Sequence, residues 1–435
     1  METMKLQDWQ VPLADRQTDV LRRERCFLSA AHTGSGKTYL AAQTIRDLGL
    51  KTLVVAPKIS LTQWRRVLEG MGAMPFVENV VNPEALITSK KQKLYDADLG
   101  WSTDARLLVF DEVHRGASGE KSKTTKALAR WCNRAHPDNK VLAMSATPFE
   151  SPLKLRALGY LMGFHQFRDA DWYRFLRANG CMLTSRDGRS HLEFTKDKLR
   201  SAAIMRRLRE AMGDRFMSIT PDQIPGFPEE SKEVVLVDLA KEDHDALVRA
   251  YEEMPERIRE PSRDEMVKVL RLRQQAEFCK AGALAEMAAN HVEDGNSVFV
   301  CVNFTDARLR IENCLSKHAI PFANIYGGQH EVERQKGIEA FQRNEVHVMV
   351  GMAAACSVAL SLHDEKHERP RVSLISPGYS AAEFSQALGR IRRVGGTFAV
   401  QKVVMAAGSV EEKVGKTIER KMDNLAVLTD DDLVR

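Results

Sequence analysis

Short apolar runs alternate with helical spacers in two separate parts of the chain. In the first 150 residues, such runs lie at residues 26–30, 52–56, 107–111 and 141–144. After residue 295 the pattern returns, with runs at residues 297–302, 346–351, 371–376 and 399–406. Buried runs separated by helices are typical of a doubly wound parallel sheet, in which helices cover both faces. The sequence therefore predicts an α/β protein with two parallel-sheet units in tandem.

The part between these units is predicted to be a basic, mainly helical insertion. Between Lys154 and Arg215 there are 14 Lys and Arg residues against 7 Asp and Glu, although the whole chain has a formal charge of only +5. The segment PDQIPGFPEESKE, which starts at Pro221, predicts a linker or turn. Apolar spacing over residues 239–292 then favours helices. We expect domains at residues 1–150, 151–235 and 236–435.

Composition restricts the class of protein. A chain of 435 residues with 43% hydrophobic residues excludes a disordered or fibrous protein. The seven cysteines are widely spread and never form a CxxC pair, which argues against a disulfide framework or a zinc cluster. The first residues lack the apolar stretch of a signal peptide, and no apolar run approaches the roughly 20 residues that span a bilayer. We expect a cytoplasmic protein with reduced thiols and no membrane partner.

A phosphate-binding loop is predicted at AHTGSGKT, residues 31–38. The segment follows an apolar run and precedes a helical stretch, and its glycines, Gly34 and Gly36, allow backbone N–H groups to turn toward a phosphate. Lys37 supplies a cation to the outer phosphates, and Thr38 offers a hydroxyl to Mg²⁺. The first glycine of the general pattern is replaced by Ala31, which leaves the later half of the loop intact.

Two acidic residues follow a buried run in LLVFDEVH, residues 107–114. Asp111 is placed to hold Mg²⁺ and Glu112 to polarise the attacking water. A pair of acids after an apolar run is common at the start of a solvated helix. The phosphate-binding loop upstream favours the catalytic interpretation. His114 is a candidate for coupling the nucleotide to MSATP, residues 144–148, although surface packing explains a histidine equally well.

Three arginines, Arg390, Arg392 and Arg393, crowd into QALGRIRR, residues 386–393. In isolation, this segment would be interpreted as a basic helix face neutralised by surface carboxylates. Because the chain also has a phosphate-binding loop, we expect these arginines to bind the phosphates of a nucleotide instead.

These motifs occur in the order and rough spacing found in helicase superfamily two. Gln10, AHTGSGKT, VVAPKISLTQW, DEVH, MSATP and QALGRIRR carry the resemblance, which spans nearly the whole chain. The chain is most similar to DExH-box ATPases of the Swi/Snf-related branch, which includes compact DNA translocases of phages and bacteria. The resemblance implies two RecA-like lobes, the first a helicase ATP-binding domain and the second a helicase C-terminal domain.

The resemblance also implies roles for individual residues, with ATP and Mg²⁺ as cofactors. The catalytic residues are expected to be Lys37, Glu112, Arg390 and Arg393, and Mg²⁺ is expected at Thr38 and Asp111. The residues expected to bind the nucleotide are Gln10, Thr33, Gly34, Ser35, Gly36, Lys37, Thr38 and Asp111. The residues expected to bind a nucleic-acid backbone are Lys58, Ser60, Thr62, Ser89 and Lys90. Arg392 is outside the motif positions and is expected to pair with an acid or to touch nucleic acid.

The expected function is an ATP-dependent helicase or translocase on double-stranded, forked or branched DNA, in replication, recombination or repair. Replication or recombination proteins are expected partners, in a prokaryotic or phage-infected cell. RNA unwinding is a rival, but VAPKISLTQW and the residues after MSATP fit the DNA branch better. A nucleotide-gated binding or loading module is a second rival, against which Glu112 and the two motif arginines weigh. A motor subunit of a restriction-type assembly is a third, weakened because no nuclease motif is recognisable.

Overall fold

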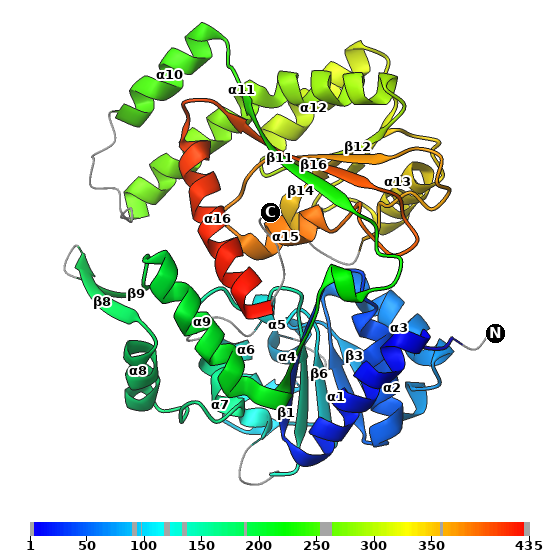
Figure 1. The fold of residues 1–435 in the computed structure, drawn as a ribbon, viewed down its shortest axis with the longest axis vertical. Helices are drawn as coiled ribbons and strands as arrows, with labels where there is room; N and C mark the ends of the chain where they lie inside the picture. Colours follow the sequence, from blue (N-terminus) through cyan, green and yellow to red (C-terminus); the bar gives the residue numbers. More distant parts are fainter. Residues whose placement is uncertain are drawn as a thin grey trace. The chain divides into compact units, whose positions relative to one another are not determined.

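The computed structural model of the chain describes residues 4–88, 94–96, 98–116, 122–132, 137–186, 189–252, 263–356 and 360–429. The chain divides into two units, one of residues Met1–Pro225 with Asp423–Val434, and one of residues Gly226–Met422. Each unit contains a six-stranded sheet. Figure 1 shows the strands and helices of both units with their labels. The prediction of two α/β units with parallel sheets is confirmed.

The first sheet contains the four runs predicted in the first 150 residues and two further strands at its edges. Every neighbouring pair in it is parallel. In spatial order the strands are β10 (Phe216–Ile219), β1 (Cys26–Ala31), β7 (Lys140–Met144), β6 (Leu107–Phe110), β2 (Thr52–Val55) and β3 (Val77–Val81). The edge strand β3 is only half-buried, with a buried valine at one position of five, and so has no continuous apolar run.

Helices cover both faces of this sheet because side chains alternate along each strand. Cys26, Leu28 and Ala30 of β1 lie in one buried cluster with the helices that follow in the sequence. These helices are α6 (Lys123–Trp131), α7 (Arg156–Leu161), α8 (Asp169–Ala178) and α9 (Lys198–Met212). Three earlier helices pack against one another and against the strands: α1 (Val11–Arg23), α2 (Lys37–Leu48) and α3 (Leu61–Gly70). Shorter elements are α4 (Ala85–Thr88), β4 (Tyr95–Asp96), β5 (Gly100–Trp101) and α5 (Val113–Gly116).

The segment predicted as a separate insertion is instead part of the first unit. Its helices α7, α8 and α9 bury apolar side chains in the same cluster as β1, and β10 joins the sheet beside β1. A hairpin of β8 (Cys181–Arg186) and β9 (Arg189–Phe194) lies between α8 and α9. The units divide at Pro225, inside the predicted linker and before the predicted boundary at residue 235. The boundary lies there because β10 pairs with β1, far away in the sequence, and the local sequence pattern does not indicate this pairing.

The second sheet is also parallel throughout. In spatial order its strands are β11 (Glu230–Val237), β16 (Ala399–Ala406), β15 (Arg371–Ile375), β12 (Ser297–Val302), β14 (Val348–Met352) and β13 (Phe322–Ile325). The helices of this unit are α10 (Lys241–Glu252), α11 (Arg263–Glu293), α12 (Thr305–Lys317), α13 (Glu331–Gln342), α14 (Ala353–Cys356), α15 (Ala381–Leu388) and the part of α16 (Val410–Thr429) before Asp423. β12 has a different buried cluster on each face, one with α11 and α12 and the other with α13, α14 and α15.

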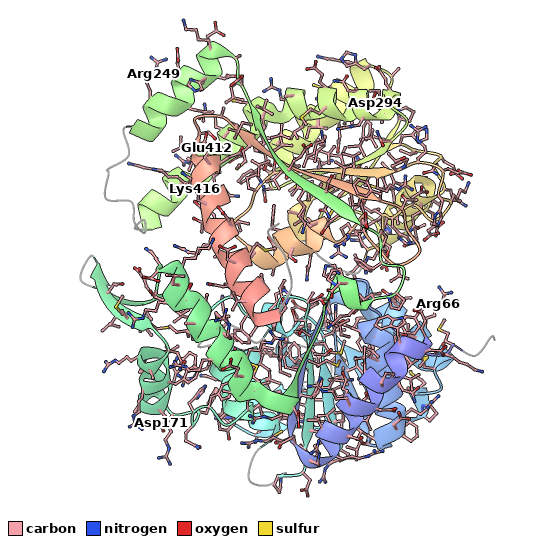
Figure 2. All side chains as sticks on the ribbon, in the orientation of Figure 1. Arg66, Asp171, Arg249, Asp294, Glu412 and Lys416 are labelled. Atoms are coloured by element: carbon pink, nitrogen blue, oxygen red, sulfur yellow. The ribbon has the colours of Figure 1, made fainter. Side chains whose placement is uncertain are left out.

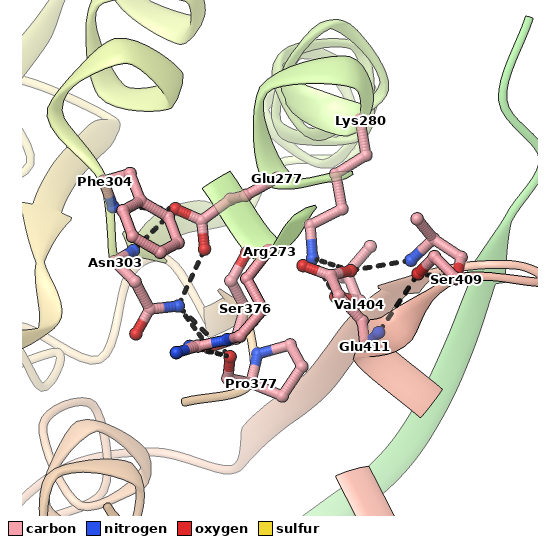
Figure 3. Close-up of polar contacts among 11 residues, drawn as sticks. Arg273, Glu277, Lys280, Asn303, Phe304, Ser376, Pro377, Val404, Ser409 and Glu411 are labelled. Atoms are coloured by element: carbon pink, nitrogen blue, oxygen red, sulfur yellow. Dashed lines mark hydrogen bonds and ion pairs between the residues drawn. The ribbon is translucent and has the colours of Figure 1, made fainter. Parts of the chain in front are cut away.

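A buried polar network ties α11 to the second sheet, as Figure 3 shows. Lys280 Nζ lies 2.6 Å from Glu411 Oε2 and donates to the carbonyl oxygen of Val404 at 2.7 Å. The Lys280 and Glu411 side chains are 0% and 2% exposed. One turn earlier on α11, Glu277 accepts hydrogen bonds from the backbone N–H groups of Asn303 and Phe304. Burial raises the pKa of Glu277, while the Lys280 charge opposes this.

Replacing Lys280 with methionine should strongly destabilise the second unit. The change leaves the Glu411 charge buried without its cation, which typically costs about 3–5 kcal/mol of unfolding free energy. Urea denaturation measures the loss. The exposed pair Arg343 and Glu345 provides the control, because Arg343→Met should change stability by less than about 1 kcal/mol. Adding Glu411→Gln to Lys280→Met should restore most of the loss. A small loss from Lys280→Met would show that water reaches the site.

Five of the seven cysteines are buried, namely Cys26, Cys132, Cys181, Cys301 and Cys356. Across the described ranges, no helix combines the length and the apolar character that crossing a membrane requires.

Candidate functional site

The loop after β1 has the backbone geometry of a phosphate cradle. Gly34 and Gly36 have φ angles of 87° and 81°, in the left-handed region that favours glycine. Gly36 is the N-cap of α2, whose first residues are Lys37 and Thr38. The first backbone N–H groups of a helix have no intrahelical carbonyl, and the helix dipole adds positive potential there. The loop therefore points donors and partial positive charge at the place where an anion would bind.

The side chains of Gln10 and Lys37 hold this loop. Gln10 is buried, and its Nε2 donates to the carbonyl oxygen of Ser35 at 3.0 Å. Its Oε1 accepts from the backbone N–H of Gln7 at 3.0 Å. Lys37 Nζ donates to the carbonyl oxygens of Ala31 at 2.8 Å and His32 at 3.1 Å. The Gln10 and Lys37 side chains therefore both stabilise the loop conformation, and Gln10 contacts the loop directly. Thr33 and Ser35 are buried within it.

Substituting Gly36 should disrupt this loop more than backbone strain alone would. A Cβ at Gly36 would lie 2.4 Å from Gln10 Nε2, so Gly36→Ala should displace Gln10 and abolish ATP hydrolysis. Gly49, which ends α2 at φ 62°, is the matched control, because its Cβ would meet nothing closer than 3.9 Å. Gly49→Ala should cost about 1–2 kcal/mol of stability and keep full activity. Equal ATPase rates in the two variants would contradict the proposed importance of the Gln10 contact.

Asp111 lies directly beyond the end of β6, buried against Trp64. Its Oδ2 accepts a hydrogen bond from Trp64 Nε1 at 3.0 Å, and its Oδ1 accepts one from the backbone N–H of Glu112. Burial and the neighbouring Glu112 charge raise the pKa of Asp111 to about 7, while Trp64 and Lys37 oppose the shift. A buried carboxyl in this situation gains from a nearby cation. Together with Thr38 at the start of α2, it fits the donor set of Mg²⁺, which accepts oxygen ligands.

Glu112 has a strained backbone and a polar side-chain network. Its φ is 49°, in the left-handed region that few residues other than glycine adopt. Glu112 Oε2 lies 3.3 Å from His114 Nδ1 and accepts a hydrogen bond from Ser145 Oγ at 3.5 Å. His114 Nδ1 and Ser145 Oγ are 2.7 Å apart. His114 therefore contacts Ser145 of the MSATP segment, and its role in coupling the nucleotide to that segment stays a prediction.

The motif arginines of the second unit converge on one carbonyl group. Arg390 Nη1 and Arg393 Nη2 each donate to the backbone oxygen of Leu360 at 3.1 Å. Arg390 is 2% exposed, whereas Arg393 is only partly buried. The structure thus brings these two side chains together at the end of α15. Their proposed role with the nucleotide stays a prediction.

Arg392 pairs with an acid, as one of its two predicted roles required. Its Nη1 lies 2.7 Å from Glu230 Oε1, and its Nε donates to the carbonyl oxygen of Pro228. Its guanidinium also lies 4.8 Å from the ring centroid of Phe227. These contacts attach the segment before β11 to the second unit.

The predicted nucleic-acid contacts begin at the turn after β2. Lys58 and Thr62 have exposed side chains there, on either side of the start of α3. Ser60 is 4% exposed, and its hydroxyl donates to the carbonyl oxygen of Pro57 at 2.9 Å, which closes the turn. Ser89 and Lys90 lie outside the described residues. The nucleic-acid roles of these residues stay predictions.

Trp64 is the residue of this site that the sequence did not reveal. It lies on α3 and belongs to no charged or glycine-rich pattern, yet its indole N–H holds the Asp111 carboxylate. Its place at the end of VVAPKISLTQW was the available signal, because that segment already belonged to the motif set.

Two family models match this chain, one in each unit. Residues 3–150 match the model described as type III restriction enzyme, res subunit. Residues 279–395 match the helicase conserved C-terminal domain. The first match contains the loop and the acids of the first unit, and the second contains Arg390 and Arg393.

Two known proteins resemble the chain over most of its length. A protein of Acanthamoeba polyphaga mimivirus, whose name describes an ATP-dependent RNA helicase, is 27% identical over 454 residues, covering 95% of this chain and 82% of the relative. The SWI2/SNF2 ATPase core of Sulfolobus solfataricus, solved in complex with double-stranded DNA, is 16% identical. It covers 95% of this chain and 91% of that one, with a TM-score of 0.40.

Proposed function

Because the chain is an ATP-dependent helicase of superfamily two, we propose that it moves along double-stranded, forked or branched DNA as it hydrolyses ATP. One observation carries the proposal. Lys37 donates to the loop whose N–H groups suit a phosphate and is close enough to the buried Asp111 carboxyl to lower its pKa, and Glu112 follows Asp111; these observations support the assignment of these residues to phosphoryl transfer from ATP.

In the proposed mechanism, residues of the first unit have different roles in ATP hydrolysis. The N–H groups of the loop and Lys37 bind the phosphates, and Gln10 keeps the loop in its shape through Ser35. Thr38 and Asp111 would hold Mg²⁺, which supplies charge neutralisation at the phosphates when bound. Glu112 is positioned to orient the attacking water and accept its proton, and its link to His114 and Ser145 fixes its carboxylate.

The second unit is proposed to contribute Arg390 and Arg393. Positive charge at the terminal phosphate stabilises the charge that develops during phosphoryl transfer, as arginine fingers do in other phosphate-loop enzymes. Movement along nucleic acid would follow if each lobe grips the backbone and the nucleotide cycle changes their separation. Contacts at Lys58 and Thr62 would recognise phosphates and carry little sequence specificity.

DNA is proposed as the substrate because the sequence favours the Swi/Snf-related branch. VAPKISLTQW and the long stretch after MSATP are the features that support this branch. RNA is the second candidate, and the name of the mimivirus relative favours it. The choice between them decides which processes the enzyme serves, including the proposed roles in replication, recombination or repair.

ATP hydrolysis with different polymers tests the proposal. The rate is measured at one stated salt concentration without nucleic acid and then with duplex DNA, single-stranded DNA, forked DNA and RNA. Strong stimulation by duplex or forked DNA would support translocation on DNA. Stimulation by RNA alone would overturn the DNA assignment. Slow hydrolysis that no polymer changes would favour a nucleotide-gated module instead.

A further inference from the structure

Several exposed arginines in residues 168–209 are outside the proposed chemistry. Within the described part of the chain, no carboxylate lies within 4.0 Å of Arg177, Arg200 or Arg206. Ion pairs among the described residues of this region include other cations: Arg156 with Asp169, Arg174 with Asp171, Lys196 with Glu193, and Lys198 with Asp423. The excess of 14 basic over 7 acidic residues between Lys154 and Arg215 is therefore only partly neutralised by internal pairing.

Some of this charge lines a hollow on α8. The hollow has a volume of about 390 Å³ and is lined by Ala170, Tyr173, Arg174 and Arg177. These residues repeat at three- and four-residue spacing, so they share one face of the helix. Asp171, labelled in Figure 2, holds Arg174 at 3.2 Å. Guanidinium groups beside an aromatic ring suit a phosphate with its attached nucleoside.

The β8–β9 hairpin exposes apolar side chains on both of its faces. Met182 and Leu183 are 54% and 56% exposed, and neighbouring residues of a strand point to opposite faces. In the hairpin Leu183 lies opposite Leu192, and Leu192 and Phe194 pack against the core of the first unit. Met182 and Leu183 nevertheless keep more than half of their surface exposed, so the fold leaves apolar surface of β8 uncovered.

The helices on either side of the hairpin are fixed to each other. Arg207 Nη2 donates to the carbonyl oxygen of Ala178 at 3.0 Å and to Asn179 Oδ1 at 2.9 Å. Gly180, at φ 72°, allows the close approach of α9, since a Cβ there would lie 2.5 Å from Ile204 Cδ1. Because these contacts hold α8 and α9 in place, the helix positions that carry the exposed arginines are fixed on the first unit, and no helix has to be ordered when a ligand binds.

We propose that α8, the β8–β9 hairpin and α9, here called the basic arm, form a nucleic-acid-binding surface separate from the predicted contacts at Lys58 and Thr62. Its arginines bind backbone phosphates, and Met182 and Leu183 pack against bases that are not stacked in a duplex. The proposal rests on the proposed function and specifies its substrate as nucleic acid with unpaired bases, such as a fork.

A polyanion suits this surface better than a protein partner does. The arginines lie on two helices, with exposed positive charge that complements phosphates. Met182 and Leu183 are two side chains on opposite faces of a hairpin, and they do not form the contiguous apolar patch typical of protein docking sites. Apolar side chains of this kind do contact unstacked bases in protein–DNA complexes.

The arginines are tested by a triple variant, Arg177→Gln with Arg200→Gln and Arg206→Gln. Binding to blunt duplex and to forked DNA is measured by fluorescence anisotropy at several salt concentrations without ATP. Three lost phosphate contacts should reduce the slope of log affinity against log salt by about 2–3 on both ligands. Basal ATP hydrolysis should not change. The matched control removes three exposed cations elsewhere on the first unit, by Lys5→Gln, Arg23→Gln and Lys126→Gln, and should keep the wild-type slope.

The apolar pair is tested by Met182→Ser with Leu183→Ser. Affinity for the fork should fall about tenfold, since contact with apolar surface is lost, whereas affinity for blunt duplex should not change. Leu99→Ser, at a residue 91% exposed outside the arm, is the control. Wild-type fork affinity and salt slope in both arm variants would overturn the proposal, as would an equal loss on fork and duplex in the serine variant. If the proposed function alone fails, the arm variants still weaken binding although no polymer stimulates ATP hydrolysis.

Discussion

Replacing Lys37 with alanine is expected to abolish ATP hydrolysis, with a rate loss of at least about a hundredfold to a thousandfold. Lys37 Nζ lies at the loop, 2.8 Å from the carbonyl oxygen of Ala31, where it can reach the outer phosphates. The same charge lowers the pKa of the buried Asp111 carboxyl. Its removal therefore weakens phosphate binding and also makes Asp111 harder to ionise for Mg²⁺.

Steady-state phosphate release measures this effect, with and without nucleic acid. Lys51→Ala is the matched control, because Lys51 is an exposed lysine of the same unit that pairs with Glu78 and Asp104. That variant should hydrolyse ATP at the wild-type rate. Circular dichroism of both variants checks that the fold is intact. Persistent turnover in the folded Lys37→Ala variant would mean that the nucleotide binds elsewhere.

The central strands could be predicted from the sequence because both of their faces are buried. β1 and β12 have buried side chains at every position, so each appears as a continuous apolar run. The edge strands β3, β11 and β13 lack this pattern. In β11 no residue is fully buried along Glu230–Val237, and β13 has one buried residue, Ile325. A half-exposed strand resembles a loop in sequence, and only pairing with its neighbour reveals it.

The domain boundaries were harder to predict for a related reason. β10 pairs with β1, and nearly 200 residues of sequence separate Leu28 from its partner Phe216. Nothing in the local pattern of residues 216–219 indicates which sheet the strand joins. The prolines of the predicted linker lie between β10 and β11, although the last residues of that segment, from Glu230, are the start of β11. They could not show that the segment before them belongs to the first unit.

The chemistry of the site was easier to predict than its supporting contacts. The glycines, lysine and threonine of this type of phosphate-binding loop are contiguous in the sequence, so Lys37 could be proposed from the local pattern, and Asp111 from its place after a buried run. The Trp64 contact depends on how α3 packs beside β6, which the sequence does not encode locally. The positive φ of Glu112 is likewise a result of the tertiary structure.

Replacing Arg393 with alanine is expected to slow the chemical step by about a thousandfold to a hundred-thousandfold while ATP binding is largely kept. An arginine finger acts mainly on the charge that develops in the transition state, so its loss lowers the rate constant more than the affinity. Arg393 is a cleaner test than Arg390, because Arg390 is 2% exposed and its loss would also disturb the packing around Leu360.

Single-turnover hydrolysis and equilibrium binding of a fluorescent ATP analogue separate the two effects. Arg392→Gln is the matched control, since the neighbouring arginine forms an ion pair with Glu230 instead of occupying a motif position. That variant should lose some stability of the second unit but keep its hydrolysis rate. If Arg392→Gln slowed the chemical step as much as Arg393→Ala, the arginines would act by holding the segment around α15 in place. A specific loss in Arg393→Ala would assign the positive charge of QALGRIRR to the nucleotide.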